Sequence, residues 1–189
     1  MSSSSKLLSD YMVELKSALE AIPTSVVEKA GDLIFSIIPN GTVFVAGNGG
    51  SAATASHFVT DLGVGSLRRT NPVRAVSLCE NMSVMTATSN DLDFSEIFSQ
   101  QLQLLGKKSD IFVAISASGN SKNLINALNM AKTLSMITVS MTGFDGGKIS
   151  KIADICIHVP TKIGSYGVVE DLHLSICHMI TELVRSKNV

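Results

Sequence analysis

The chain has 189 residues, of which 45% are hydrophobic and 16% are charged, and its formal net charge is −1. This length and composition fit one globular domain with a sizeable core and exclude a disordered chain. The sequence has no basic stripe, acidic tail or long apolar run, so we expect neither a nucleic-acid partner nor a membrane-spanning segment.

The cysteines and the first residues bear on the compartment. Three cysteines, Cys79, Cys156 and Cys177, lie inside apolar runs without the spacing of a metal site or a disulfide framework. This usage favours a reducing environment. The opening residues, MSSSSKLLSD, contain no apolar core of signal-peptide length. We therefore expect a cytoplasmic protein.

Two helices are expected first. Apolar residues recur at helical spacing over residues 6–21, and Pro23 ends that pattern. Ser25 followed by Glu28 predicts a capping box at the start of a second helix that runs to about Ile38.

The rest of the chain alternates strands with helices. Strands are expected over residues 42–46, 73–78, 111–115, 136–141 and 154–159. Helices are expected over residues 52–62, 83–89, 100–105, 122–134 and 168–185. The strands are apolar on both faces and most precede a helix, which predicts an α/β fold with a parallel sheet covered on both sides.

Two similar loops follow two of these strands, in TVFVAGNGGSAATASHF and DIFVAISASGNSKNLINAL. A helix start offers unpaired N–H groups, and small residues let an anion approach them closely. The four hydroxyls of Ser51, Ser116, Ser118 and Ser121 add donors. One such loop is equally well explained as a tight turn with an N-cap serine. Two of them, each after a buried strand, favour a phosphorylated ligand at the carboxyl edge of the sheet.

A dinucleotide site is the rival interpretation. Gly47, Gly49 and Ala52 satisfy the pattern G-x-G-x-x-A, and Glu80 follows the next strand, where an acid could bind a ribose. This weak pattern gives no role to the second loop, so we keep it as a minor alternative.

Histidines and carboxylates recur on two expected helices. His57 and Asp61 are four residues apart and share one helix face, while Glu170 and His178 are eight apart on the last helix. Such a set could bind a metal ion, transfer protons, or serve packing and surface roles alone. His173 points about 140° away from His178 around an ideal helix, which makes it a supporting or structural residue. His158, at a strand end, is expected to be structural.

Five stretches together resemble the sugar isomerase (SIS) domain, and most closely its phosphoheptose isomerase group: AGNGGSAATASHF, AISASGNS, the pair Asn90–Asp91, MTGFDGG and EDLHLSICHMI. The resemblance implies one SIS domain over residues 1–189, folded as a three-layer α/β sandwich around a five-stranded parallel sheet with flavodoxin-like winding. It also implies a homotetramer with active sites between subunits, in which the N-terminal helical segment, residues 1–38, takes part in oligomer packing.

The resemblance implies roles for single residues. Ser51, Ser116, Ser118 and Ser121 would cradle the substrate phosphate, with Asn48 and Gly49 beside them and Asp91 at the sugar end. A zinc ion would be held by His57, Asp61, Glu170 and His178. Asp61 or Glu170 would be the catalytic base, and His178 the acid.

The chain departs from the family pattern on the substrate side. Asp61 stands where the family has Glu, and Glu170 where it has Gln. Gly65 and Val168 stand at family arginine positions, and Ala117 at a family threonine position. The phosphate-binding serines are therefore kept, while the shell around the sugar is altered.

The function implied is aldose–ketose isomerisation of sedoheptulose 7-phosphate or a related sugar phosphate through an enediol, in a route to surface polysaccharide. The alternative is a regulatory SIS protein that binds a phosphosugar without catalysis, like the replication-initiator-associating group. That group lacks the last-helix histidine, so His178 favours the isomerase.

Overall fold

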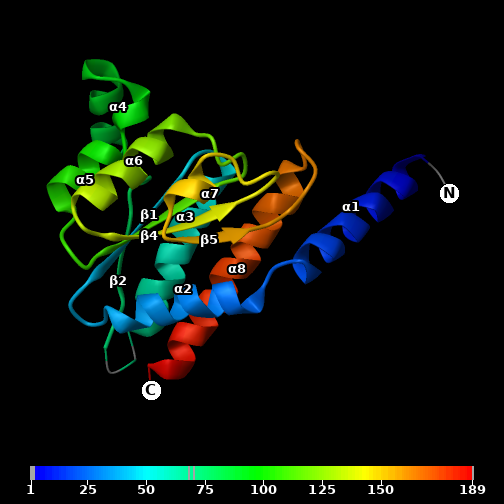
Figure 1. The fold of residues 1–189 in the computed structure, drawn as a ribbon, viewed down its shortest axis with the longest axis horizontal. Coiled ribbons are helices and arrows are strands. Elements are labelled where there is room, and N and C mark those ends of the chain that lie inside the picture. Colours follow the sequence, from blue (N-terminus) through cyan, green and yellow to red (C-terminus); the bar gives the residue numbers. More distant parts are fainter. Residues whose placement is uncertain (1–2, 68, 70, 189) are drawn as a thin grey trace.

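The expected strands form one parallel sheet in the computed structural model, which describes residues 3–67, 69 and 71–188 (Figure 1). The strands are β1 (Thr42–Gly47), β2 (Arg74–Ser77), β3 (Ile111–Ser116), β4 (Ile137–Thr142) and β5 (Ile155–His158). Their order is β2-β1-β3-β4-β5, and every neighbouring pair is parallel. This is the flavodoxin-like order, in which the chain turns back between β1 and β3.

Helices cover both faces of the sheet. They are α1 (Ser3–Glu20), α2 (Thr24–Ser36), α3 (Gly50–Gly63), α4 (Met82–Asp91), α5 (Ser99–Leu105), α6 (Lys122–Thr133), α7 (Ile149–Ile152) and α8 (Tyr166–Lys187), with single 3₁₀ turns η1 (Val64–Ser66) and η2 (Phe94–Glu96). The side chains of Val43 and Val45 belong to a core with α2, α3 and α8, whereas Phe44 and Ala46 belong to a second core with α5 and α6. Successive strand residues point to opposite faces, so β1 is buried on both faces. The predicted three-layer sandwich is confirmed.

Most of the expected helices and strands shift by only a few residues at their ends, and two further differences concern α2 and α7. The predicted capping box is wrong: α2 begins at Thr24 with Pro23 at its N-cap and no side-chain cap, so Ser25 already lies inside the first turn. The short helix α7 was not expected, because a single turn is too short to show helical periodicity.

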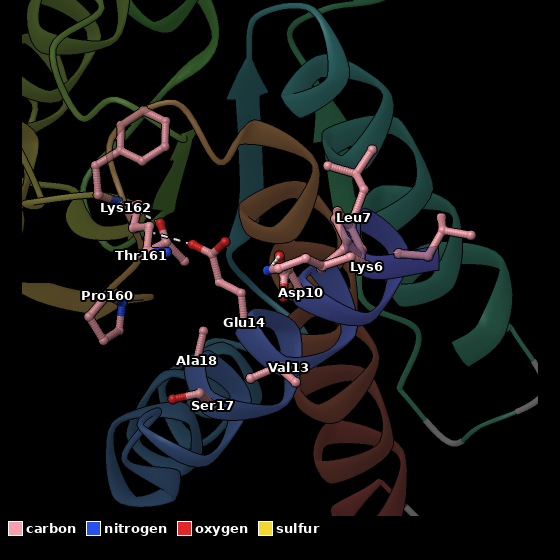
Figure 2. Close-up of a pocket in the computed structure, with 13 residues that line it drawn as sticks. Lys6, Leu7, Asp10, Val13, Glu14, Ser17, Ala18, Pro160, Thr161 and Lys162 are labelled. Carbon is pink, nitrogen blue, oxygen red and sulfur yellow. Dashed lines mark hydrogen bonds and ion pairs between the residues drawn. The ribbon is translucent and has the colours of Figure 1, made fainter. Parts of the chain in front are cut away.

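Helix α1 extends from the body of the molecule beside α8 (Figure 1). Tyr11 Oη donates a hydrogen bond to Asp171 Oδ2 at 2.6 Å, and this bond together with partial burial raises the pKa of Tyr11 to about 12. A groove of about 1050 Å³ separates α1 from the segment after β5, where Lys162 N donates to Glu14 at 3.3 Å (Figure 2). Leu8 and Met12 remain 67% and 69% exposed. The helix therefore presents an apolar face that the described residues of its own chain do not cover.

The three cysteines are free thiols, and burial is the main cause that raises the pKa of Cys177. None of the described helices is both long and apolar enough to cross a lipid bilayer.

Candidate active site at the switch point of the sheet

The two serine loops meet in one cavity. They follow β1 and β3, which are neighbours in the sheet, so both lie at the crevice where strand order reverses. The cavity has a volume of about 190 Å³ and is lined by Asn48, Ser51, Ile115, Ser116, Ala117, Ser118, Ser121, Tyr166 and Glu170. The structure thus brings together all four predicted phosphate-binding serines, Asn48 and Glu170. We call this space the serine cavity.

The first loop leaves the start of α3 open. Gly49 has a φ of 54° and would place a Cβ with nothing within 4 Å, so a ligand can approach this backbone. At Gly50 a Cβ would lie 2.3 Å from Glu170 Oε2. The Glu170 carboxylate therefore rests against the first turn of α3, where the helix dipole favours negative charge.

The second loop is braced by the glycine turn after β4. Ser116 Oγ accepts a hydrogen bond from Gly119 N at 3.1 Å. Gly119 has a φ of 62°, and a Cβ there would lie 2.1 Å from the carbonyl oxygen of Gly146. Gly147 packs as closely on Ser118, where its Cβ would lie 2.5 Å from the carbonyl oxygen. These two backbone contacts indicate the role of the MTGFDGG motif, which is to hold the second loop in place.

An asparagine pair joins the two loops. Asn48 Nδ2 donates to Asn123 Oδ1 at 3.0 Å, and Asn123 Nδ2 donates to Asn48 Oδ1 at 2.8 Å. Asn123 is only 2% exposed. Asn123 was not among the predicted site residues, because a polar residue in the first turn of a helix gives no sign of burial. The pair fixes Asn48 across the switch point.

A second cavity adjoins the first. It has a volume of about 310 Å³, shares Asn48 and Ser121 with the serine cavity, and is also lined by Asp93, Phe94, Ser95, Lys122 and Asn123. Hydrogen bonds from Ser95 lower the pKa of Asp93. The expected sugar-end residue, Asp91, lies elsewhere: it is exposed at the end of α4, where its Oδ1 accepts from Asn90 Nδ2 at 2.7 Å.

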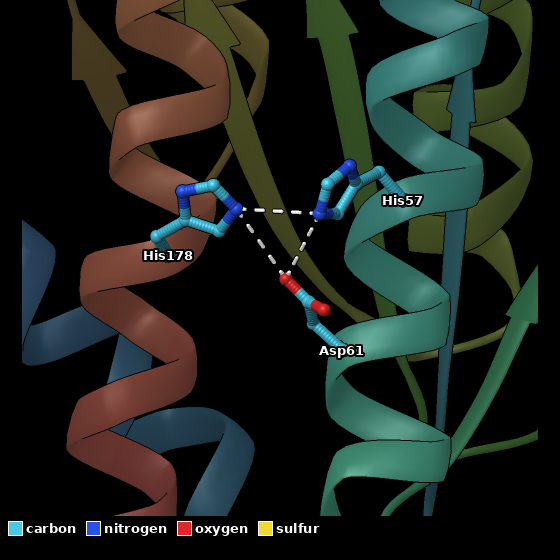
Figure 3. A group of neighbouring side chains, drawn as sticks. All are labelled: His57, Asp61 and His178. Carbon is cyan, nitrogen blue, oxygen red and sulfur yellow. Dashed lines mark hydrogen bonds and ion pairs between the residues drawn. The ribbon is translucent and has the colours of Figure 1, made fainter.

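His57, Asp61 and His178 form a cluster between α3 and α8 (Figure 3). The two Nε2 atoms lie 3.3 Å apart, and Asp61 Oδ2 is 3.3 Å from His57 Nε2 and 3.5 Å from His178 Nε2. The two helices run parallel, since Glu170 meets Gly50 at one end and the histidines meet further along. The serine cavity and the cluster therefore lie at different heights along one helix pair.

The donor spacing of the cluster fits a metal ion. Donors bonded to one ion at about 2.0–2.1 Å in a tetrahedron lie about 3.3 Å apart, which matches the three separations in the cluster. The histidine side chains are 47% and 51% exposed, so the remaining position faces an open surface. Glu170, the fourth expected ligand, is placed beside Gly50 at the serine cavity instead.

The other two histidines have different surroundings. His173 is fully buried, neither ring nitrogen has a hydrogen-bond partner of normal geometry, and burial lowers its pKa to about 4 despite the nearby backbone of Thr142. His158 Nε2 donates a hydrogen bond to the carbonyl oxygen of Phe144 at 3.0 Å.

The residues that differ from the family pattern near the expected sugar have defined surroundings in the structure. Val168 is buried in the core, and Ala117 packs with Phe144 and Val169. The space beside Gly65 is taken by Arg185, whose Nη2 would lie 2.2 Å from a Cβ at that position. Arg185 Nη2 also donates to the carbonyl oxygen of Asp61 at 3.4 Å.

Comparisons with known proteins agree with the geometry. Residues 9–143 match the family model of the SIS domain. A protein named probable phosphoheptose isomerase from Thermoplasma volcanium is 37% identical over 180 residues, which cover 95% of this chain and 91% of that one. The phosphoheptose isomerase of Helicobacter pylori strain P12 is 35% identical, with 90% of this chain and 88% of that one covered.

Solved structures give the same result. The phosphoheptose isomerase of Neisseria gonorrhoeae superimposes with a TM-score of 0.88 at 31% identity, covering 96% of this chain and 98% of the other. That of Francisella tularensis superimposes with a TM-score of 0.86 at 28% identity, covering 98% and 100%. The dinucleotide alternative has no support among these relatives. The chain belongs to the SIS-domain family and, within it, to the phosphoheptose isomerases.

Proposed function

We propose that this protein is an enzyme that interconverts the aldose and ketose forms of a sugar phosphate. One observation carries the proposal: the serine cavity and the His57–Asp61–His178 cluster lie along the same pair of parallel helices. Donors for a phosphate at one end and acid–base groups at the other are what an isomerase requires. The phosphoheptose isomerase relatives support the same function.

In this proposal the phosphate occupies the serine cavity. Ser51, Ser116, Ser118 and Ser121 donate hydroxyl groups, and the start of α3 adds the positive end of its helix dipole. Asn48 orients the substrate, held by its pair with Asn123. Asp91 serves the sugar end only if a neighbouring subunit brings it there, since it lines neither cavity of its own chain.

The separation along α3 favours a long sugar. Six residues from Ser51 to His57 correspond to about 9 Å of helix rise. An extended chain advances about 1.2 Å per bond, so seven or eight bonds join a phosphorus atom at the first residue to a reacting carbon at the second. A hexose or heptose phosphate has that length. Sedoheptulose 7-phosphate is therefore the first substrate to test.

Proton transfer falls to Asp61 and His178. Asp61 takes a proton from the carbon next to the carbonyl, and the bonding pair forms the enediol double bond. His178 gives a proton to the carbonyl oxygen, and the reverse transfer at the neighbouring carbon completes the isomerisation. Asp61 is the better base of the two candidates, because Glu170 lies two helix turns away beside Gly50.

Zinc is the cofactor that we propose for the cluster. Two imidazoles and one carboxylate suit zinc better than magnesium, which prefers oxygen ligands. Bound through His57 Nε2, His178 Nε2 and Asp61 Oδ2, zinc would supply a Lewis acid for the substrate oxygens in place of the proton from His178, and the second carboxylate oxygen of Asp61 would stay free as the base. Glu170 would join these ligands only by turning away from Gly50. A cytoplasmic enzyme and a role in polysaccharide synthesis fit the same family.

Solvent proton exchange tests the isomerase. The protein is incubated with sedoheptulose 7-phosphate in deuterated water, and deuterium in the sugar is measured by mass spectrometry. We expect turnover with deuterium uptake, and a loss of at least about 100-fold in kcat/KM for His178→Ala. Met179→Ala, at an adjacent exposed position, is the control. Phosphosugar binding without turnover or exchange would favour the regulatory alternative.

Elemental analysis tests the zinc. We expect close to one zinc per chain in the parent and in Met179→Ala, and a marked loss in His57→Ala and His178→Ala. An active parent that neither carries nor accepts zinc would refute the metal and leave the isomerase in place.

A further inference from the structure

Tyr166 forms one wall of the serine cavity. It lies in the first turn of α8, one helix turn before Glu170, so both side chains are on the same face of the helix. Its side chain is 54% exposed, although it carries an aromatic ring. Nothing in the mechanism above uses it.

The Tyr166 ring is held by Phe144. The two rings meet edge to face, with centroids 5.0 Å apart and an angle of 86° between their planes. Phe144 is buried to 7% exposure and packs on Ala117, which also lines the cavity. The ring of Tyr166 is thus supported on the side away from solvent.

Phe144 adopts an unusual backbone for this contact. Its φ is 52°, the left-handed region that a bulky residue rarely adopts. Phe144 N donates to Thr161 Oγ1 at 3.3 Å, and the Phe144 carbonyl oxygen accepts a hydrogen bond from His158 Nε2. Such strain persists where the surroundings determine it, and it gathers at ligand sites. The strained backbone of Phe144 is therefore consistent with a ligand site beside the ring of Tyr166.

The serine cavity is lined by neutral and acidic side chains, which bears on the role of Tyr166. The residues that line it include no lysine or arginine, and Glu170 adds a carboxylate. An anion must be held there by neutral donors, so one more donor matters. A tyrosine supplies a phenolic O–H on a rigid ring.

We propose that Tyr166 donates a hydrogen bond to the phosphoryl group of the substrate, and that Phe144, fixed by His158 and Thr161, positions its ring. This inference rests on the proposed phosphate role of the serine cavity. It does not depend on catalysis, because it concerns binding alone.

The chain allows a direct spectroscopic test. It contains two tyrosines and no tryptophan, so Tyr11→Phe leaves Tyr166 as the sole tyrosine emitter. This variant is titrated with inorganic phosphate and with sedoheptulose 7-phosphate while tyrosine fluorescence is recorded. We expect a saturable change with each, at the midpoint found by isothermal titration calorimetry. Binding by calorimetry without any change in Tyr166 emission would overturn the proposal.

Removing one oxygen atom measures the contact. We expect Tyr166→Phe to weaken binding of both probes about 10-fold and to raise KM with kcat nearly unchanged. Tyr11→Phe is the matched control and should bind as the parent does, because Tyr11 does not line the serine cavity. Phe144→Leu should weaken binding by a smaller factor than Tyr166→Phe does. It should also spread the fluorescence change over a wider range of ligand concentration.

The outcomes separate the two proposals. If Tyr166→Phe binds inorganic phosphate as tightly as the parent, the Tyr166 contact is refuted whatever the activity. If binding falls as expected but the parent shows no isomerisation, the contact stands and the isomerase fails. If the parent binds neither probe, both fail.

Discussion

At the scale of single residues, burial decides what a polar side chain does. His173 and His178 lie on the same helix, yet one is enclosed by core residues and the other faces open space between α3 and α8. Residue type alone could not show which of these two histidines is buried and which is exposed. Their positions on opposite sides of α8 did separate them, because the sheet contacts only one side.

The buried histidine predicts a pH dependence of stability. The pKa of His173 falls from an ordinary 6.5 to about 4 in the folded protein, because burial disfavours the charged ring. Between these values the unfolded chain binds the proton and the folded protein does not, so the free energy of unfolding decreases as pH falls. The shift corresponds to about 3 kcal/mol.

We expect His173→Leu to reduce this dependence. The difference in denaturation midpoint between pH 7 and pH 4.5 should be smaller in the variant than in the parent. Only the difference between the two pH values is compared, so a change in packing that shifts both midpoints equally does not affect the result. Equal differences in the two proteins would refute the assignment of this acid sensitivity to His173.

At the scale of elements, strands and loops were predictable where local sequence determines them. β1 and β3 are buried on both faces, and their continuous apolar runs predicted them as strands. The glycine and serine loops were predictable as parts of one candidate site because their chemistry is local, and the structure brings them together in the serine cavity. The Asn48–Asn123 pair and the place of Glu170 were not predictable, since each depends on which part of another element lies opposite.

The two loop glycines give a matched test at this scale. Gly49 and Gly119 both have positive φ, but a Cβ at Gly49 meets nothing within 4 Å, whereas one at Gly119 would lie 2.1 Å from a backbone oxygen of Gly146. Gly49→Ala should cost about 1–3 kcal/mol of backbone strain, because a φ of 54° with a ψ of −124° lies in a sparsely populated region for any residue with a Cβ. Gly119→Ala should cost more, because two backbone segments must also separate.

Urea denaturation of the two variants measures this contrast. A similar loss of stability in both would show that the glycine turn after β4 yields without cost and does not brace the second loop.

At the scale of the whole molecule, the exposed apolar face of α1 indicates that another subunit packs on it. Leu8 and Met12 are exposed on a helix that extends from the body beside a groove of about 1050 Å³. Burial of apolar side chains is the main favourable term in association. We therefore predict that the protein is an oligomer, and we propose a homotetramer with residues 1–38 in its interfaces and the active sites between subunits.

Light scattering with size-exclusion chromatography checks the assembly. We expect a tetramer at micromolar concentration and a smaller species for the double variant Leu8→Glu and Met12→Glu. Lys16→Gln, an exposed polar change on the same helix, is the control. A monomeric parent would refute the assembly and any active site that needs two subunits.

The parallel register of α3 and α8 has a consequence for how this protein can diversify. One residue inserted between Glu170 and His178 would turn the histidine by about 100° around the helix and shift it by about 1.5 Å, which would break the cluster with His57 and Asp61. Substitutions at the ends of the helix pair carry no such penalty. Laboratory evolution toward shorter or longer sugars should therefore yield point substitutions around the two cavities and no insertion or deletion within residues 170–178.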